Sequence, residues 1–273
     1  MIVAALGVLG LCLGSFVNAL VWRLHEQEEH PAKAKALSVV SGRSMCPHCR
    51  HELAAKDLLP VLSWLYLQGK CRYCGKRISV QYPVVELAMA AAFIASYLWW
   101  PHSFDVRQTV LLGLWLVLVA GLAALLVYDL RWFILPNRLI YPLAVAAAAF
   151  AAVNITAATA PVKSLVSLFL AVVIGGGIFY VIFQLSAGKW IGGGDVKLGW
   201  LLGLIAGTPA KAVLFIFLAS ILGTLVSLPL VATGRLGRRS NIPFGPFLIA
   251  GTFITVLFGS HIITWYKTLV GLS

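Results

Sequence analysis

The sequence predicts an all-α polytopic membrane protein with about eight transmembrane helices and a cytoplasmic four-cysteine zinc-knuckle loop between the first two. Hydrophobic residues make up 60% of the 273 residues and charged residues only 11%, whereas a soluble domain carries about 25% charged residues. Several apolar stretches approach or exceed the ~20 residues that a helix needs to cross a bilayer. These stretches are continuously apolar rather than alternating, which argues against a β-barrel.

Eight segments are apolar enough to be candidate spans. They are residues 2–22, 83–99, 106–128, 137–155, 164–186, 196–207, 212–232 and 244–265. The first lacks the basic start and small-residue cleavage site of a signal peptide, so we interpret it as a span. The sixth would give about 18 Å of helix, against a hydrocarbon core of ~30 Å. It is therefore either a half-span, or the glycines before it also lie at membrane depth beside protein or a wet cavity.

The basic residues predict an orientation. The net charge is +12, but the cations lie in loops between apolar segments, as in membrane proteins, and this excludes nucleic acid as the expected partner. With both termini outside, 17 of the 21 Lys and Arg residues lie on the inner side; without the loop 24–82, the ratio is still 8 to 4, or 7 to 4 if Arg23 is also left out. We therefore expect outer termini and a cytoplasmic four-cysteine loop.

Four acidic residues lie beyond the long loop: Glu86, Asp105, Asp129 and Asp195. An Asp at the centre of a membrane helix costs about 2.5–3.5 kcal/mol, so such residues usually have a function. We expect Asp105 to be an exposed anion at a helix N-terminus. Glu86 could be structural or functional.

Asp129 and Asp195 both fall on the cytoplasmic side of this topology. Two carboxyl groups suffice for peptide hydrolysis, because one activates water while the other, protonated, supports the scissile carbonyl. A helix N-terminus favours the Asp195 anion and a C-terminus disfavours the Asp129 anion, so we predict Asp195 as base and Asp129 as acid. The alternative is that each acid only pairs with a cation, Asp129 with Arg131 or Arg138 and Asp195 with Lys197.

Three glycines, Gly192, Gly193 and Gly194, directly precede Asp195. Glycine allows an extended backbone to approach closely, as a peptide substrate must. We therefore expect Gly192, Gly193, Gly194 and Lys197 to support the substrate backbone.

Two CxxC pairs, Cys46/Cys49 and Cys71/Cys74, are separated by 21 residues. This spacing is typical of a structural zinc site, and four thiolates suit tetrahedral Zn²⁺ with no open position. A cytoplasmic location argues against disulfides, which leaves four reduced thiols without metal as the alternative. Cys12 lies in an apolar stretch, where we expect a small buried hydrophobe.

An ordered set of motifs resembles the bifunctional prepilin leader peptidases with N-methyltransferase activity, of the GxGD aspartyl protease group. The motifs are GSFVNALVWR at 14–23, the two CxxC pairs with LPVLSW at 59–64 between them, IS at 78–79, YPVVEL at 82–87, Asp129 followed by Leu135-Pro136, IGGGDVKL at 191–198 and IPFGPF at 242–247. Many members carry further acids near the first aspartate, where this chain has Arg131 and Asn137.

The resemblance implies a function and a division of the chain. The enzyme would remove the basic leader of type IV prepilins or pseudopilins at the cytoplasmic face of the bacterial inner membrane. It would then methylate the new N-terminal residue with S-adenosylmethionine. Asp129 and Asp195 match the catalytic pair, and the four cysteines match the zinc knuckle. Residues 1–100 would form a methyltransferase-associated domain and residues 101–273 a six-span aspartyl peptidase domain.

Three other functions fit parts of the pattern. A proton-coupled transporter could also use glycine-broken helices and two membrane acids. A membrane adaptor could use the zinc knuckle without any chemistry. A peptidase without methyltransferase activity would be a narrower version of the same enzyme.

Overall fold

The structure, a computed structural model, describes residues 1–33, 37–39, 42–156, 159–234 and 242–271. Regular structure in these residues is helical, apart from two isolated β-bridges. The chain divides into two compact units, Met1–Leu98 and Trp99–Ser273. All-α architecture is confirmed, and the two units are described separately below.

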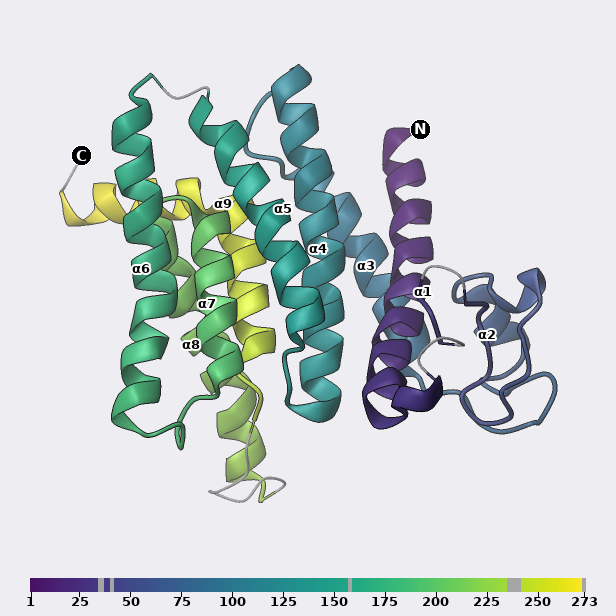
Figure 1. Cartoon of the computed structure of the whole chain (residues 1–273). Coiled ribbons are helices and arrows are strands. Elements are labelled where there is room, and N and C mark those ends of the chain that lie inside the picture. Colours follow the sequence, from purple (N-terminus) through teal and green to yellow (C-terminus); the bar gives the residue numbers. More distant parts are fainter. Residues whose placement is uncertain (34–36, 40–41, 157–158, 235–241, 272–273) are drawn as a thin grey trace. The chain divides into compact units, whose positions relative to one another are not determined.

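The first unit is built on two long helices, α1 (Ile2–Glu29) and α3 (Gln81–Leu98), which pack against each other (Figure 1). Glycines bring the two backbones together: a Cβ on Gly14 would lie 2.6 Å from the Cα of Glu86, and one on Gly10 would lie 2.7 Å from the Cα of Ala90. Small residues at a helix interface are typical of membrane helices.

The segment between α1 and α3 holds three short helices. These are η1 (Pro31–Lys33), η2 (Ala55–Asp57) and α2 (Leu62–Tyr66). The four cysteines lie in this segment, as predicted. α1 itself continues to Glu29, beyond the predicted span end at Trp22, so its last residues leave the apolar stretch.

The second unit is a bundle of six described helices in which successive helices run antiparallel (Figure 1). They are α4 (Val106–Trp132), α5 (Asn137–Thr156), α6 (Pro161–Leu185), α7 (Gly193–Ala206), α8 (Pro209–Ala232) and α9 (Gly245–Val270). The C-terminus of α4 and the N-termini of α7 and α9 consequently lie at the same end of this bundle.

The shortest of the six, α7, is the most enclosed. It is 14 residues long, and eight of these are buried. Glycines again allow close packing: a Cβ on Gly203 would lie 2.7 Å from the Cα of Val172 on α6. The helix includes Gly193 and Gly194, which the sequence suggested as a possible non-helical lead-in; only Gly192 precedes it, as the N-cap.

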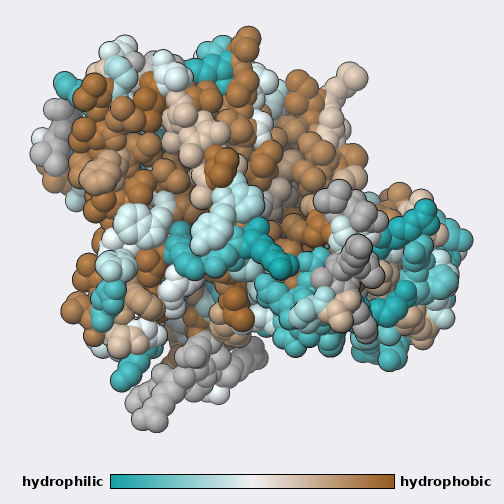
Figure 2. Space-filling model, viewed as in Figure 1, coloured by the Kyte–Doolittle hydropathy of each residue, from teal (hydrophilic) through white to brown (hydrophobic). Residues whose placement is uncertain are grey.

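Seven of the described helices are long and apolar enough to cross a membrane. They correspond to seven of the predicted spans, and α7 occupies the short sixth one. In Figure 2, hydrophobic side chains cover much of the second unit, whereas the four-cysteine segment is mainly hydrophilic. Large apolar residues such as Phe217, Leu225 and Leu228 on α8 are exposed, as expected of a lipid-facing helix. The chain is a multi-pass membrane protein.

Candidate active site and metal centre

Asp129 lies in the last turn of α4 and is only 5% exposed. Phe133, the C-cap of α4, has a left-handed backbone (φ 57°), and its N–H donates to the Asp129 carbonyl oxygen at 2.9 Å. The side-chain Oδ2 atom is buried without a hydrogen-bond partner among the described residues. Buried polar atoms are nearly always satisfied in folded proteins, so this oxygen is a candidate to receive a ligand.

Asp195 lies in the first turn of α7 and is half-buried. Its backbone N–H donates to the Gly192 carbonyl oxygen at 3.1 Å. Its carboxyl group is close enough to that of Asp129 for the two to interact electrostatically. The helix arrangement therefore brings together two acids that are 66 positions apart in the sequence.

Neither aspartate forms an ion pair within the described part of the chain. Lys197 instead donates to Asn137 Oδ1 at 2.9 Å, which links α7 to the start of α5. The Arg131 guanidinium lies over the Trp132 ring, 5.1 Å from its centroid. The simple ion-pair explanation of both acids is therefore not observed.

Gly245, at the start of α9, is a third component that the sequence analysis did not assign to the site. Its backbone lies against the Asp129 carboxyl group, and a Cβ at this position would lie 2.5 Å from Oδ2. The sequence signal was present: Pro243 and Pro246 flank this glycine at the start of an apolar span.

The three glycines before Asp195 differ from one another. A Cβ on Gly194 would lie 3.2 Å from the Leu135 side chain, so close packing explains this glycine. A Cβ on Gly192 or Gly193 would meet nothing closer than 3.8 Å. Packing within the described chain therefore does not require glycine at these two positions.

Replacing Gly245 with alanine should impair the site without unfolding the bundle. The added methyl group would force the Asp129 carboxyl to turn away, and a displacement of about 1 Å at a reacting group costs on the order of a hundredfold in rate. If the aspartate pair is hydrolytic, as the motif resemblance implies, we expect its activity to fall by about that factor while the melting temperature changes little.

Gly113→Ala on α4 is the matched control, since a Cβ there meets nothing within 4 Å. It should leave activity unchanged and stabilise the helix by about 0.5–1 kcal/mol. Full activity in Gly245→Ala would contradict the placement of this glycine at the site.

The four cysteine sulfurs form one cluster, with all four atoms within 4.8 Å of one another. Cys46 and Cys71 are buried, and the Cys46 and Cys74 sulfurs lie 4.0 Å apart, too far for a disulfide. Tetrahedral Zn²⁺ with bonds of ~2.3 Å requires sulfur separations of roughly 3.8 Å. The donor set and its spacing therefore fit one metal ion.

The two knuckles share one backbone pattern. The Cys46 N–H donates to the His51 carbonyl and the Arg50 N–H to the Cys46 carbonyl; the Cys71 and Gly75 N–H groups make the equivalent bonds to Lys76 and Cys71. A β-bridge closes each knuckle, Met45 with Glu52 and Lys70 with Arg77. Such turns point both sulfurs of a pair in the same direction.

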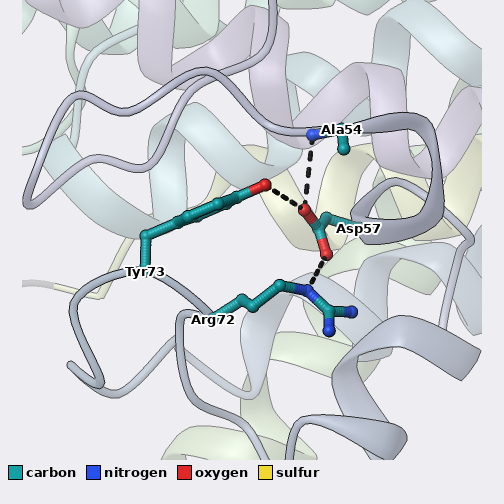
Figure 3. A network of polar contacts seen from close by, with 4 residues as sticks. All are labelled: Ala54, Asp57, Arg72 and Tyr73. Atoms are coloured by element: carbon teal, nitrogen blue, oxygen red, sulfur yellow. Dashed lines mark hydrogen bonds and ion pairs between the residues drawn. The ribbon is translucent and has the colours of Figure 1, made fainter.

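A polar network joins η2 to the second knuckle (Figure 3). Asp57 accepts hydrogen bonds from Arg72 Nε at 2.7 Å, from the Tyr73 hydroxyl at 3.0 Å and from the Ala54 N–H at 3.3 Å. Burial alone would raise the pKa of Asp57, but the hydrogen bonds from Arg72, Tyr73 and Ala54 outweigh it and hold the pKa below its ordinary value. The network is therefore intact at neutral pH and is lost only as the pH falls through that lowered pKa.

The first knuckle is attached to α1. Arg50 forms an ion pair with Glu26 at 2.7 Å, and its guanidinium lies 5.1 Å from the centroid of the Trp22 ring. His51 of the first knuckle stacks on Tyr73 of the second, with ring centroids 3.7 Å apart. The helical extension of α1 past Trp22 thus supplies part of the support for the metal centre.

Glu86 on α3 has a structural role in the same unit. It is 5% exposed, and its Oε2 accepts the Val61 N–H at 2.7 Å. Val61 has a positive φ of 60°, which is strained for a β-branched residue and needs a compensating interaction. The sequence left Glu86 open between two roles, and the structure supports positioning of the 58–66 loop.

Together, the fold and these sites define the class: a helical, multi-pass membrane protein with two neighbouring aspartates and a four-cysteine centre. Two family models match the chain, the bacterial peptidase A24 N-terminal domain over residues 8–100 and the type IV leader peptidase family over residues 116–228. No solved structure matches it.

Curated relatives match over nearly the full length. A protein of Bacillus subtilis (strain 168) is 34% identical and covers 95% of both chains. Proteins of Stutzerimonas stutzeri and Aeromonas hydrophila are each 31% identical, over 95% and 94% of this chain and 91% of their own. All three are named prepilin leader peptidase/N-methyltransferase. This chain belongs to the type IV leader peptidase family, which confirms the resemblance predicted from its motifs.

Proposed function

We propose that this chain is a membrane aspartyl endopeptidase that removes the leader of type IV prepilins or pseudopilins and then N-methylates the new N-terminal residue. The relatives' shared name supports both activities. The single observation that carries the peptidase chemistry is the buried, unpaired Oδ2 of Asp129 beside Asp195.

The two acids divide the hydrolytic work. Asp195, near the positive end of the α7 dipole, is the base that takes a proton from water as the water oxygen attacks the scissile carbonyl carbon. Asp129 is the protonated acid: its Oδ2 hydrogen bonds to the carbonyl oxygen and then supplies the proton that the leaving nitrogen needs as the C–N bond breaks. Two neighbouring carboxyls cannot both ionise cheaply, which is why they share one proton.

The open backbone before Asp195 supports the substrate. Gly192 and Gly193 leave room for an extended peptide, and Lys197, held by Asn137, borders the same turn. Following the distribution of basic residues, we place this end of the bundle at the cytoplasmic face of the bacterial inner membrane, with both termini outside. The lipid bilayer then presents the apolar part of a prepilin beside the site.

The four-cysteine centre is structural in this proposal. Cys46, Cys49, Cys71 and Cys74 would hold one Zn²⁺, which leaves no open coordination position for catalysis. Residues 1–100 would serve the methyl transfer and residues 101–273 the proteolysis. S-adenosylmethionine supplies the methyl group.

The function is tested with the purified full chain in liposomes, a prepilin and S-adenosylmethionine, by weighing the product. We expect a prepilin that has lost its leader and whose mass exceeds that of the cleaved, unmethylated chain by one methyl group. Omission of the methyl donor should give the cleaved, unmethylated chain. Cleavage without methylation would limit the enzyme to proteolysis. Absence of any cleavage, together with solute uptake by the same liposomes, would instead favour the transporter.

A further inference from the structure

A second polar site lies in the bundle of the second unit, far from the aspartates. A cavity of about 500 Å³ is lined by residues of the loop before α4, by the adjoining parts of α4 to α8 and by Val256 of α9. Gln108 lines it, and 21 residues of α4 separate Gln108 from Asp129, which is about 32 Å along the helix. The leader peptidase chemistry does not use this cavity.

The charged groups of the cavity are all basic. Lys163 in the first turn of α6, Lys211 in the first turn of α8 and His102 line it, and none of its described lining residues is acidic. Lys211 is half-buried and forms no ion pair in the described chain. Lysines at the ends of membrane helices usually extend outward to the lipid headgroups, so a half-buried one that lines a cavity needs another explanation.

The positive charges near the cavity act on the neighbouring His102. Burial lowers the pKa of His102, and the positive charges of Lys211 and Arg107 lower it further below its ordinary value, with Asp105 acting weakly in the opposite direction. Asp105 is engaged as the N-cap of α4, where it accepts the Gln108 backbone N–H at 2.6 Å. No ion pair joins Asp105 to Lys211 among the described residues.

Hydrogen-bond donors are available in the same cavity. Gln108 is only 3% exposed, and its Oε1 accepts the Trp100 indole N–H at 3.1 Å. Its side-chain NH₂ makes no hydrogen bond to the described residues. Ser164 and Ser167 on α6 line the cavity with hydroxyls that are likewise unpaired in the described chain. α6 also begins there without a side-chain cap, and free N–H groups at a helix N-terminus attract anions.

The remaining wall is apolar. Leu111, Phe150 and Leu168 line the cavity beside the polar groups. A volume of about 500 Å³ is within the range of small-molecule sites, roughly 300–1,000 Å³, and exceeds what one inorganic anion would fill. The chemistry therefore fits an anion joined to a carbon skeleton.

We propose that this cavity binds a phosphate-bearing organic anion, with Lys211, Lys163 and the Gln108 amide as ligands of the phosphate. Phosphate offers several acceptor oxygens and a negative charge, which match these clustered donors. The phosphate could belong to the headgroup of an anionic phospholipid or to a soluble phosphate ester, and the test separates these sources.

Native mass spectrometry of the delipidated full chain tests the proposal, with phosphatidylglycerol, zwitterionic phosphatidylcholine and glycerol phosphate as probes. We expect one phosphatidylglycerol per chain, bound in preference to phosphatidylcholine. Lys211→Met and Gln108→Leu should each weaken binding about tenfold or more, as expected for the loss of one hydrogen bond to a charged group. Competition by glycerol phosphate would assign the soluble source, and its failure to compete would assign the lipid.

Lys267→Met, in the last turn of α9 and outside the cavity lining, is the matched control and should bind as the wild type does. If Lys211→Met or Gln108→Leu destabilises the protein, Lys163→Met still tests the proposal, because Lys163 is exposed and its substitution should not affect folding. Absence of binding of both phosphatidylglycerol and glycerol phosphate, or equal binding by the wild type, Lys211→Met and Lys163→Met, would overturn the proposal. Leader cleavage, measured in parallel, reports separately on the aspartate site.

Discussion

Asp129→Asn and Asp195→Asn will each reduce leader cleavage by about 10²–10⁴-fold while the protein remains folded. General acid–base catalysis by a positioned side chain contributes roughly 10²–10⁴-fold, and each substitution removes one of the two proton carriers. Asparagine keeps the size of the side chain, so the packing around the buried Asp129 is preserved. The prediction is checked by the single-turnover rate of prepilin cleavage in liposomes. The melting temperature of each variant, measured in parallel, shows whether the protein remains folded.

Asp105→Asn provides the control on the same helix. Asp105 caps α4 by accepting the Gln108 N–H, and asparagine is an equally good N-cap. Because Asp105 lies at the opposite end of α4 from Asp129, this variant should cleave at the wild-type rate. Wild-type turnover in Asp129→Asn or Asp195→Asn would rule out the hydrolase, and loss of activity in all three variants would point to a general effect of charge removal.

The sequence predicted the elements of the fold because its apolar segments are long and separated by basic loops. It did not predict where α1 ends. Residues from Arg23 to Glu29 are polar, so hydropathy places them outside a span, yet Glu26 pairs with Arg50 and the helix continues. Such contacts between distant positions are not visible in a local pattern.

The glycines show a similar limit. The short sixth span suggested that the glycines before Asp195 could form a non-helical lead-in, and glycine disfavours helix by about 1 kcal/mol relative to alanine. In the structure Gly193 and Gly194 are the first residues of α7, and Gly194 packs on Leu135 from the α4–α5 connection. Tertiary packing therefore overrides the local propensity at this position.

The two candidate acids could be selected from the sequence because acids are rare in the apolar segments. Gly245 could not be assigned a role, since its proximity to Asp129 results from the packing of α9 beside α4. The cysteines are the opposite case, because their spacing alone specifies a compact cluster.

Cys46→Ser will abolish the binding of the proposed Zn²⁺ by the four-cysteine centre. Structural Zn²⁺ sites of small domains bind with about 10–16 kcal/mol, so each of four thiolates contributes roughly 3 kcal/mol, which is about a hundredfold in affinity. We expect one zinc per wild-type chain by elemental mass spectrometry and little zinc in Cys46→Ser after dialysis against a weak chelator. Cys12 is exposed on α1, not buried as the sequence analysis expected, and lies outside the cluster, so Cys12→Ser should retain the metal.

The same variant distinguishes an enzyme from an adaptor. Cys46 and the aspartate pair belong to different compact units, so loss of metal should open the knuckles without removing the groups that hydrolyse the peptide. Hydrogen exchange should become faster first at the backbone amides of positions 46 and 71, which donate hydrogen bonds within the knuckles. Methylation should then fall more than cleavage. If Cys46→Ser abolished all function while Asp195→Asn left it intact, the function would depend on the four-cysteine centre and not on hydrolysis, and the chain would be an adaptor.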